Sequence, residues 1–222
     1  MAMKKFWMIL LAAVAMAAPA VAQSKGCSLE AALGLLDRTS VGFKSVQTDF
    51  EWDQFQKVVE EHDLQRGVMY FRRAGTSVDV SADIRTPAPG KKLLLKDGAL
   101  QVFARKTQQV TNYDARKNQQ NFESFLALGF GGPGKDLPKN FTVRCSGTET
   151  AMGVATYKLE LVPKSNEARR MFPLITLWIN QQTGMSVLQK FQEGREDYRL
   201  AKYTNFKSNQ KLPEDAFKLK AK

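Results

Sequence analysis

The sequence predicts a mainly β protein: one large, curled antiparallel sheet of about eleven strands, an incomplete barrel, with a few helical pieces over one side. Three observations support this fold class. Short segments in which apolar and polar residues alternate recur along most of the chain, as in half-buried strands. Turn sequences such as NQQTG separate them. Eleven strands are also too many for a flat open sheet, which curls or closes at that size.

The expected elements follow one another along the chain. A short N-terminal helix comes first, with Ser28 as a candidate cap and with Leu29, Leu33 and Leu36 on one apolar stripe. The expected strands are SVQTDFEWDQF, LQRGVMYFRR, SVDVSADI, the two arms of LLLKDGALQVF around an Asp97-Gly98 turn, QQVTNY, FTVRCSG, YKLELVP, LITLWIN, SVLQKFQ and YRLAKYTNF.

Two segments interrupt this series of strands. The sequence NFESFLALGFGGPG, residues 121–134, predicts a short helix that glycines and Pro133 end. The sequence PKSNEARRMFP, residues 163–173, predicts an irregular loop with Arg169, Arg170 and Met171 near its tip. Long loops of this kind are often functional.

Some of the expected strands are apolar on both faces. In LQRGVMYFRR, Val68 and Tyr70 point to one face, and Met69 and Phe71 point to the other. The LLLKDGALQVF hairpin shows the same feature. A sheet with one wet face alternates cleanly, so a helix, a second sheet or a ligand must cover the other face. We favour helices that form a lid over an apolar cavity on the concave face. An ordinary packed core is the alternative.

The first 22 residues have the order of a secretory signal peptide. Lys4 and Lys5 precede an apolar run and the small-residue site Ala20-Val21-Ala22. The apolar run is short for a membrane anchor, which needs about 20 residues. We expect cleavage after Ala22, a periplasmic location, and one domain over residues 23–222.

Charge and cysteines narrow the classes of partner. Removal of Lys4 and Lys5 lowers the formal net charge from +11 to +9. Such a charge suits an anionic membrane surface or an acidic partner, or simply a solvated surface. Export and the absence of aromatics interleaved with the basic residues argue against nucleic acid. Cys27 and Cys145 are the only cysteines; an oxidising compartment permits one disulfide between them.

No catalytic or metal-binding pattern is visible. The one histidine, His62, lies in the polar sequence KVVEEHD, and two distant thiols with a lone histidine make no ligand cluster. No Ser or Cys has a base at recognisable spacing, and no Gly-rich phosphate loop precedes a helix. Asp49, Glu51 and Asp53 share a strand face that we expect to meet solvent. We therefore expect neither an enzyme nor a cofactor or metal.

The order of these segments resembles the periplasmic outer-membrane lipoprotein carriers, the LolA-like family. SVQTDFEWDQF is similar to the family's aromatic-rich first strand, and GVMYFRRAG to its strand that carries a glycine and then an Arg-Pro pair. RTPAPGKKLLLKDGALQVFARKTQQV, GVATYKLELVPK, LITLWINQQTG and YTNFKSNQKLPEDAFKL are similar to later segments. One departure is Arg73-Ala74 in place of Arg-Pro, with Arg72 as a substitute candidate.

The resemblance implies an incomplete eleven-stranded barrel whose helical lid covers a cavity for lipoprotein acyl chains. It also implies an inner-membrane donor complex and an outer-membrane acceptor; we expect a monomer. A lipid- or lipoprotein-sensing module of the same fold is the alternative function. Arg73 matches the family's arginine that bonds lid carbonyls. The side chains expected to bind acyl chains with Arg73 are Phe50, Trp52, Met69, Phe71, Leu94, Phe103, Phe122, Phe125, Trp178 and Phe191.

Overall fold

The structure is a computed structural model of the chain. It describes residues 26–75, 77–96, 99–113, 125, 127–194 and 196–219. The expected signal peptide and the Asp97-Gly98 turn lie outside the described residues, as do residues 121–124, which include Phe122, and 126 of the predicted helix at 121–134.

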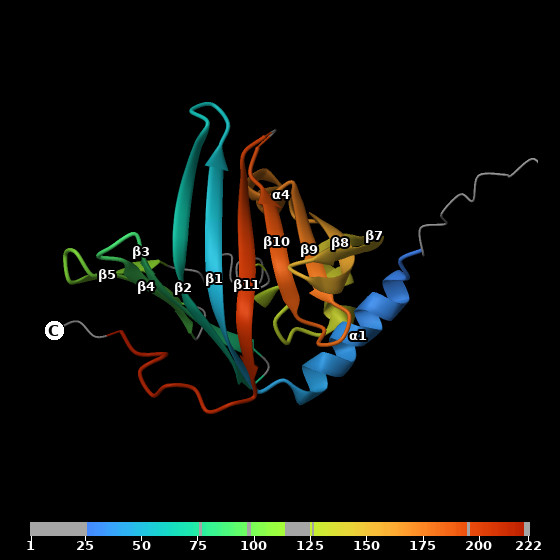
Figure 1. The fold of residues 1–222 in the computed structure, drawn as a ribbon, viewed down its shortest axis with the longest axis horizontal. Coiled ribbons are helices and arrows are strands. Elements are labelled where there is room, and N and C mark those ends of the chain that lie inside the picture. Colours follow the sequence, from blue (N-terminus) through green and yellow to red (C-terminus); the bar gives the residue numbers. More distant parts are fainter. Residues whose placement is uncertain are drawn as a thin grey trace, which may run out of the picture.

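Eleven strands of the described residues form one antiparallel sheet (Figure 1). Their spatial order is β6-β5-β4-β3-β2-β1-β11-β10-β9-β8-β7, so all adjacent strands in the sheet are consecutive in sequence except β1 and β11. With β6 and β7 at opposite ends, the sheet curls without closing, which confirms the predicted fold class. The strands are β1 Ser45–Gln56, β2 Glu61–Ala74, β3 Ser77–Thr86, β4 Lys91–Lys96, β5 Ala99–Ala104, β6 Gln109–Tyr113, β7 Phe141–Ala151, β8 Val154–Pro163, β9 Leu174–Asn180, β10 Ser186–Gln192 and β11 Tyr198–Ser208.

The longest helix among the described residues, α1 (Leu29–Gly42), begins where the sequence predicts. The Ser28 hydroxyl accepts a hydrogen bond from the Ala31 N–H at 3.1 Å, which caps the first turn. Ala32 and Leu36 are buried against the sheet. A short 3₁₀ turn, η2 (Gly134–Asp136), leads into α3 (Leu137–Asn140). None of the helices in the described ranges is long and apolar enough to cross a membrane.

The prediction of an irregular loop at 163–173 was wrong. Residues Asn166–Met171 form the helix α4. The Ser165 hydroxyl accepts from the Ala168 N–H at 3.1 Å, an N-cap that the sequence already contained. Glu167 in the first turn and two arginines in the last turn also suit the helix dipole.

The concave face of the sheet holds the main core. Alternation along β1 places Val46 and Phe50 on this face and Asp49 and Glu51 on the other. One cluster of buried side chains lies under strands β1 to β4 and β11, and a second lies between α1 and strands β7 to β9. Helix α1 lies across this side of the sheet (Figure 1).

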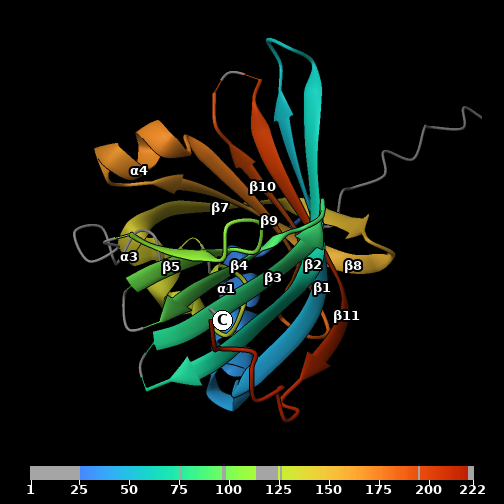
Figure 2. The same ribbon diagram turned by 90° about the vertical axis from the view of Figure 1, so that its left-hand side faces the viewer.

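The C-terminal segment, residues 209–219, explains why β2 is apolar on both faces. Val68 and Tyr70 on the convex face pack against Leu212, Ala216 and Phe217. The guanidinium of Arg72 lies 4.1 Å from the centre of the Phe217 ring. Figure 2 shows β2 to β4 between this segment in front and α1 behind. Part of the two-sided apolar pattern is therefore covered by the chain's own tail.

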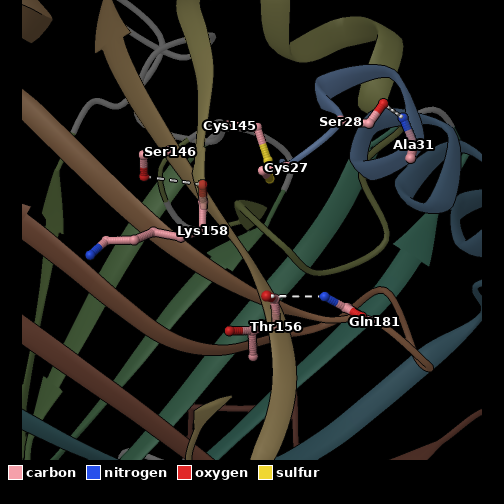
Figure 3. The surroundings of a disulfide bond; sticks show 8 residues. All are labelled: Cys27, Ser28, Ala31, Cys145, Ser146, Thr156, Lys158 and Gln181. Carbon is pink, nitrogen blue, oxygen red and sulfur yellow. Dashed lines mark hydrogen bonds between the residues drawn. A yellow bond between two sulfur atoms is a disulfide. The ribbon is translucent and has the colours of Figure 1, made fainter. Parts of the chain in front are cut away.

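A disulfide joins the start of α1 to strand β7. Cys27 and Cys145 have Cα atoms 5.5 Å apart and are separated by 118 positions in the sequence (Figure 3). The pairing that the sequence permitted is therefore present. It ties the N-terminal end of α1 to the edge strand of the sheet.

Candidate functional site

The interior of the curled sheet is filled by a loop that we call the inner loop, residues 127–133. Its Phe130 is completely buried. The Phe130 ring stacks on Phe71 of β2, with centroids 4.1 Å apart and planes inclined by 11°. It meets Tyr203 of β11 edge-on at 4.8 Å. One aromatic side chain of the loop thus occupies the space against two strands at the centre of the sheet.

Two glycines allow the inner loop to approach the sheet this closely. Gly129 and Gly131 have φ angles of +75° and +73°, which L side chains rarely adopt. A Cβ on Gly129 would lie 2.4 Å from the Cβ of Ser186, and one on Gly131 would lie 2.3 Å from the Phe43 ring. A Cβ on Gly132 would meet nothing within 4 Å. The loop conformation therefore depends on Gly129 and Gly131 but not on Gly132.

Arg73 of β2 joins the inner loop to the end of α1. Its Nη2 donates to the carbonyl of Gly131 at 2.8 Å and to that of Ser40 at 3.1 Å. Its Nε donates to the carbonyl of Phe43 at 3.1 Å. A guanidinium has five N–H donors and no acceptor, so it suits a place where backbone carbonyls converge. This geometry matches the contact that the family resemblance implies for Arg73.

A second set of hydrogen bonds holds the loop from β10. The Gln189 Nε2 donates to the Leu128 carbonyl at 2.6 Å, and the Tyr203 hydroxyl donates to the Gln189 Oε1 at 3.0 Å. The Ser186 N–H donates to the Gly129 carbonyl at 3.0 Å. Burial raises the pKa of Tyr203 well above its ordinary value, and the Trp52 side chain lowers it in part. Tyr203 therefore remains a neutral hydrogen-bond donor.

The other half of the interior is aromatic. Phe125 packs edge-on against Phe141 at 6.0 Å and against Phe172 at 5.2 Å. Phe172 in turn lies 5.2 Å from Phe191 of β10. A pocket of about 180 Å³, partly open to solvent, lies between Leu36 of α1, Val78 of β3 and the inner loop. Among the residues that the structure describes, side chains of the loop and its surroundings therefore fill much of the interior.

The structure brings together most of the residues that the sequence proposed for acyl-chain binding. On the concave side of the sheet lie Phe50, Trp52, Met69, Phe71, Arg73, Phe125 and Phe191. The strand register places three others on the convex side: Leu94, Phe103 and Trp178.

Those three residues have other surroundings. Phe103 lines a groove with Lys92, Arg105 and Asp215 beside the C-terminal segment. The Trp178 indole donates to Glu149 and lies under the ammonium of Lys158 at 5.3 Å. All three lie on the convex face because side chains one position apart on a strand point to opposite faces, and Leu94 and Phe103 are buried there.

Sequence reasoning missed Phe130, Gln189 and Tyr203. Phe130 lies in GFGGPG, where the glycines indicated only the end of a helix, although a phenylalanine between two glycines was a usable signal. Gln189 is 2% exposed and occupies an inward position of β10 that periodicity alone assigns to an apolar residue. No group of three or more His, Cys, Asp or Glu side chains suited to a metal occurs among the residues that the structure describes.

Comparisons with known proteins agree on the fold. No protein-family model matches this sequence, and neither does any curated protein. Among solved structures, the MucA/MucB complex of Pseudomonas aeruginosa matches 87% of this chain and 61% of its own chain at 13% identity, with a TM-score of 0.52. The lipoprotein LppX of Mycobacterium tuberculosis matches 83% of this chain and 97% of its own at 13% identity, with a TM-score of 0.50.

A third structure is described as a LolA superfamily protein, NE2245 of Nitrosomonas europaea. It matches 86% of this chain and 98% of its own at 15% identity, with a TM-score of 0.43. At these identities the likeness to MucB and LppX shows a shared fold. The chain spans about three fifths of the MucB chain that it matches.

Proposed function

We propose that this protein is a periplasmic carrier that buries acyl chains of lipoproteins or other lipids and delivers them toward the outer membrane. The observation that supports it most is the inner loop. Its Phe130 ring is fully buried in an apolar interior, and the loop itself is held mainly by hydrogen bonds to its backbone carbonyls. Such a loop can move out without breaking the sheet, and the space that the Phe130 ring leaves then suits another apolar group of similar width.

The energies favour exchange between the loop and an acyl chain. Burial of a Phe side chain stabilises by about 1.5–3 kcal/mol, whereas each buried methylene contributes about 0.8 kcal/mol. A chain of several methylenes therefore exceeds the contribution of Phe130, and the hydrogen bonds of the loop offset part of the gain. A carrier needs this balance because it must also release its cargo.

The inner loop is the moving part in this proposal, and α1 stays in place. The disulfide holds α1 at its N-terminal end. Arg73 holds the C-terminal end through Ser40 and Phe43, and these two bonds remain when the Gly131 contact breaks. We therefore expect the interior to open on the side of the inner loop.

Lipid extraction of the protein purified from periplasm tests the proposal. Native mass spectrometry should detect a bound lipid or lipopeptide, and a lipid-free sample should take up a fluorescent fatty acyl probe. A protein that carries no lipid and takes up no probe would contradict it.

The likeness to MucB, whose solved complex contains MucA, supports a second candidate: a sensor that binds a protein partner when its interior holds lipid. Transfer of acyl cargo between two vesicle populations separates the two functions. A carrier speeds transfer, whereas a sensor binds lipid without speeding it. An inner-membrane donor and an outer-membrane acceptor are partners only of the carrier.

A further inference from the structure

Gln189 is a buried amide in an otherwise apolar wall. It is 2% exposed, and its cross-strand neighbours are Leu177 on β9 and Ala201 on β11, which are both buried. Burial of an amide costs free energy unless its groups are hydrogen-bonded. The hydrogen-bond partners of the Gln189 amide therefore show how its burial is compensated.

The two ends of the amide have different kinds of partner. The Leu128 carbonyl can only accept, so the Gln189 nitrogen must face the inner loop, at 2.6 Å. The amide oxygen then accepts from Tyr203, a residue of the sheet itself, at 3.0 Å. The bond to Tyr203 persists when the inner loop leaves, and the bond to Leu128 does not. Tyr203 thus keeps the amide nitrogen directed at the space that the loop vacates.

Displacement of the loop leaves an N–H donor of Gln189 without a partner in an apolar space. A buried donor without a partner destabilises the state in which it occurs. A hydrocarbon tail cannot remove this cost, whereas a neutral carbonyl oxygen can replace that of Leu128. A free carboxylate is a poorer match because it must be buried with its charge.

We infer that Gln189 recognises the neutral carbonyl of an ester- or amide-linked acyl chain, and so selects acylated cargo over plain hydrocarbon. This inference rests on the proposed function, since it requires the inner loop to be displaced by lipid. Tyr203 is the positioning residue, because it fixes which end of the amide faces the cargo.

A matched pair of probes tests the inference: methyl hexadecanoate and hexadecyl methyl ether, which have the same sixteen-carbon chain and differ in the carbonyl. Both are measured by displacement of one fluorescent acyl probe from the wild-type protein. We expect the ester to bind about tenfold more tightly than the ether, because about 1.4 kcal/mol corresponds to a factor of ten.

Gln189→Met keeps the length of the side chain and removes the donor. Loss of the hydrogen bond to the Leu128 carbonyl loosens the inner loop and raises the affinity for both probes. The readout is therefore the ratio of ester to ether affinity, which should fall to about one. Tyr203→Phe should lower the ratio as well, because the amide is then free to turn over. Leu188→Met, on the convex face of β10 opposite Trp178, is the control and should keep the wild-type ratio.

The outcomes separate this inference from the proposed function. Equal binding of the two probes to the wild type, or a ratio that Gln189→Met leaves unchanged, overturns the inference and leaves the carrier function standing. Failure of the wild type to bind the fluorescent probe at all overturns both. Because the wild-type ratio is itself decisive, the test does not depend on the folding of any variant.

Discussion

The ring of Phe130 lies 4.1 Å from the ring of Phe71 and nearly parallel to it, although the two residues belong to separate parts of the fold. Phe71 is on a central strand, and Phe130 is on a loop between two glycines of positive φ. In the carrier proposed above, an acyl chain that takes the place of Phe130 would have to separate the two rings. The stability of this stacked state and the affinity for lipid would then be coupled.

Replacement of Phe130 by alanine should raise acyl-probe affinity and lower stability. The variant loses a side chain that is buried in the closed state alone, and such a change typically costs about 3–5 kcal/mol of unfolding free energy. Because the closed loop competes with lipid, its weakening favours binding. Probe titration and urea unfolding measure the two effects.

Phe217→Ala is the matched control for Phe130→Ala. Phe217 packs on the convex face against Arg72, so its truncation should reduce stability without a change in probe affinity. Lower affinity in Phe130→Ala would instead show that this ring forms part of the wall that holds the cargo.

Arg73→Leu should slow release of the probe and raise its affinity about tenfold. The variant loses all three hydrogen bonds of the guanidinium. In the proposed function the bonds to Ser40 and Phe43 are present whether the inner loop is in place or displaced, so only the lost bond to the Gly131 carbonyl shifts the balance toward lipid. Arg72→Leu is the control. Its guanidinium points to the other face, where it pairs with Asp79 at 2.8 Å. Weaker binding by Arg73→Leu would mean that Arg73 contacts cargo and does not act as a latch.

Gly131→Ala should open the inner loop, and Gly132→Ala should not. A methyl group at position 131 would overlap the Phe43 ring, and the alanine would have to adopt a φ of +73°. At position 132 it meets open space. Hydrogen exchange of the Gly129 and Phe130 amides should accelerate in Gly131→Ala alone, and equal exchange in both variants would contradict the role of the glycines.

Removal of the disulfide should destabilise the protein. A closed loop of this length contributes about 4–5 kcal/mol in the chain-entropy account, with 118 positions between Cys27 and Cys145. The double variant Cys27→Ser/Cys145→Ser should unfold at lower urea concentration than the oxidised wild type. Two free thiols in the unfolded, unreduced wild type would show that the bond does not form in the cell.

Much of the sheet could be predicted because its strands alternate strongly. The strand SVQTDFEWDQF and its ten companions were all found, and Ser28 correctly indicated the start of α1. Which face is the inside is harder to predict. Leu94 and Phe103 are as apolar as Leu93 and Val102, and only the pairing register of the folded sheet shows that they lie on the convex face.

The content of the interior could not be predicted for a different reason. Phe130 contacts Phe71 and Tyr203 across long stretches of sequence, and local periodicity carries no information about such contacts. The inward position of Gln189 also conflicts with the apolar pattern of its strand. The reason for an amide at this position is visible only in the structure, where it donates a hydrogen bond to the Leu128 carbonyl.

Two tryptophans, Trp52 and Trp178, remain after the expected cleavage at Ala22, and they can report where acyl chains bind. Trp52 lies on the concave side, packed 4.6 Å from Phe50, and Trp178 lies on the convex side beside Lys158. Brominated acyl chains quench indole fluorescence on contact. Trp178→Phe leaves Trp52 as the reporter of the interior, and Trp52→Phe leaves Trp178 as the reporter of the outer face.

The decisive measurement is the titration of these two single-tryptophan variants, over residues 23–222, with a brominated hexadecanoyl ester. If acyl chains replace Phe130 inside the sheet, Trp52 fluorescence is quenched to saturation, and Trp178 fluorescence stays unchanged at the same concentrations. Quenching of Trp178 without Trp52, or of neither, would contradict the burial of acyl chains beneath the inner loop.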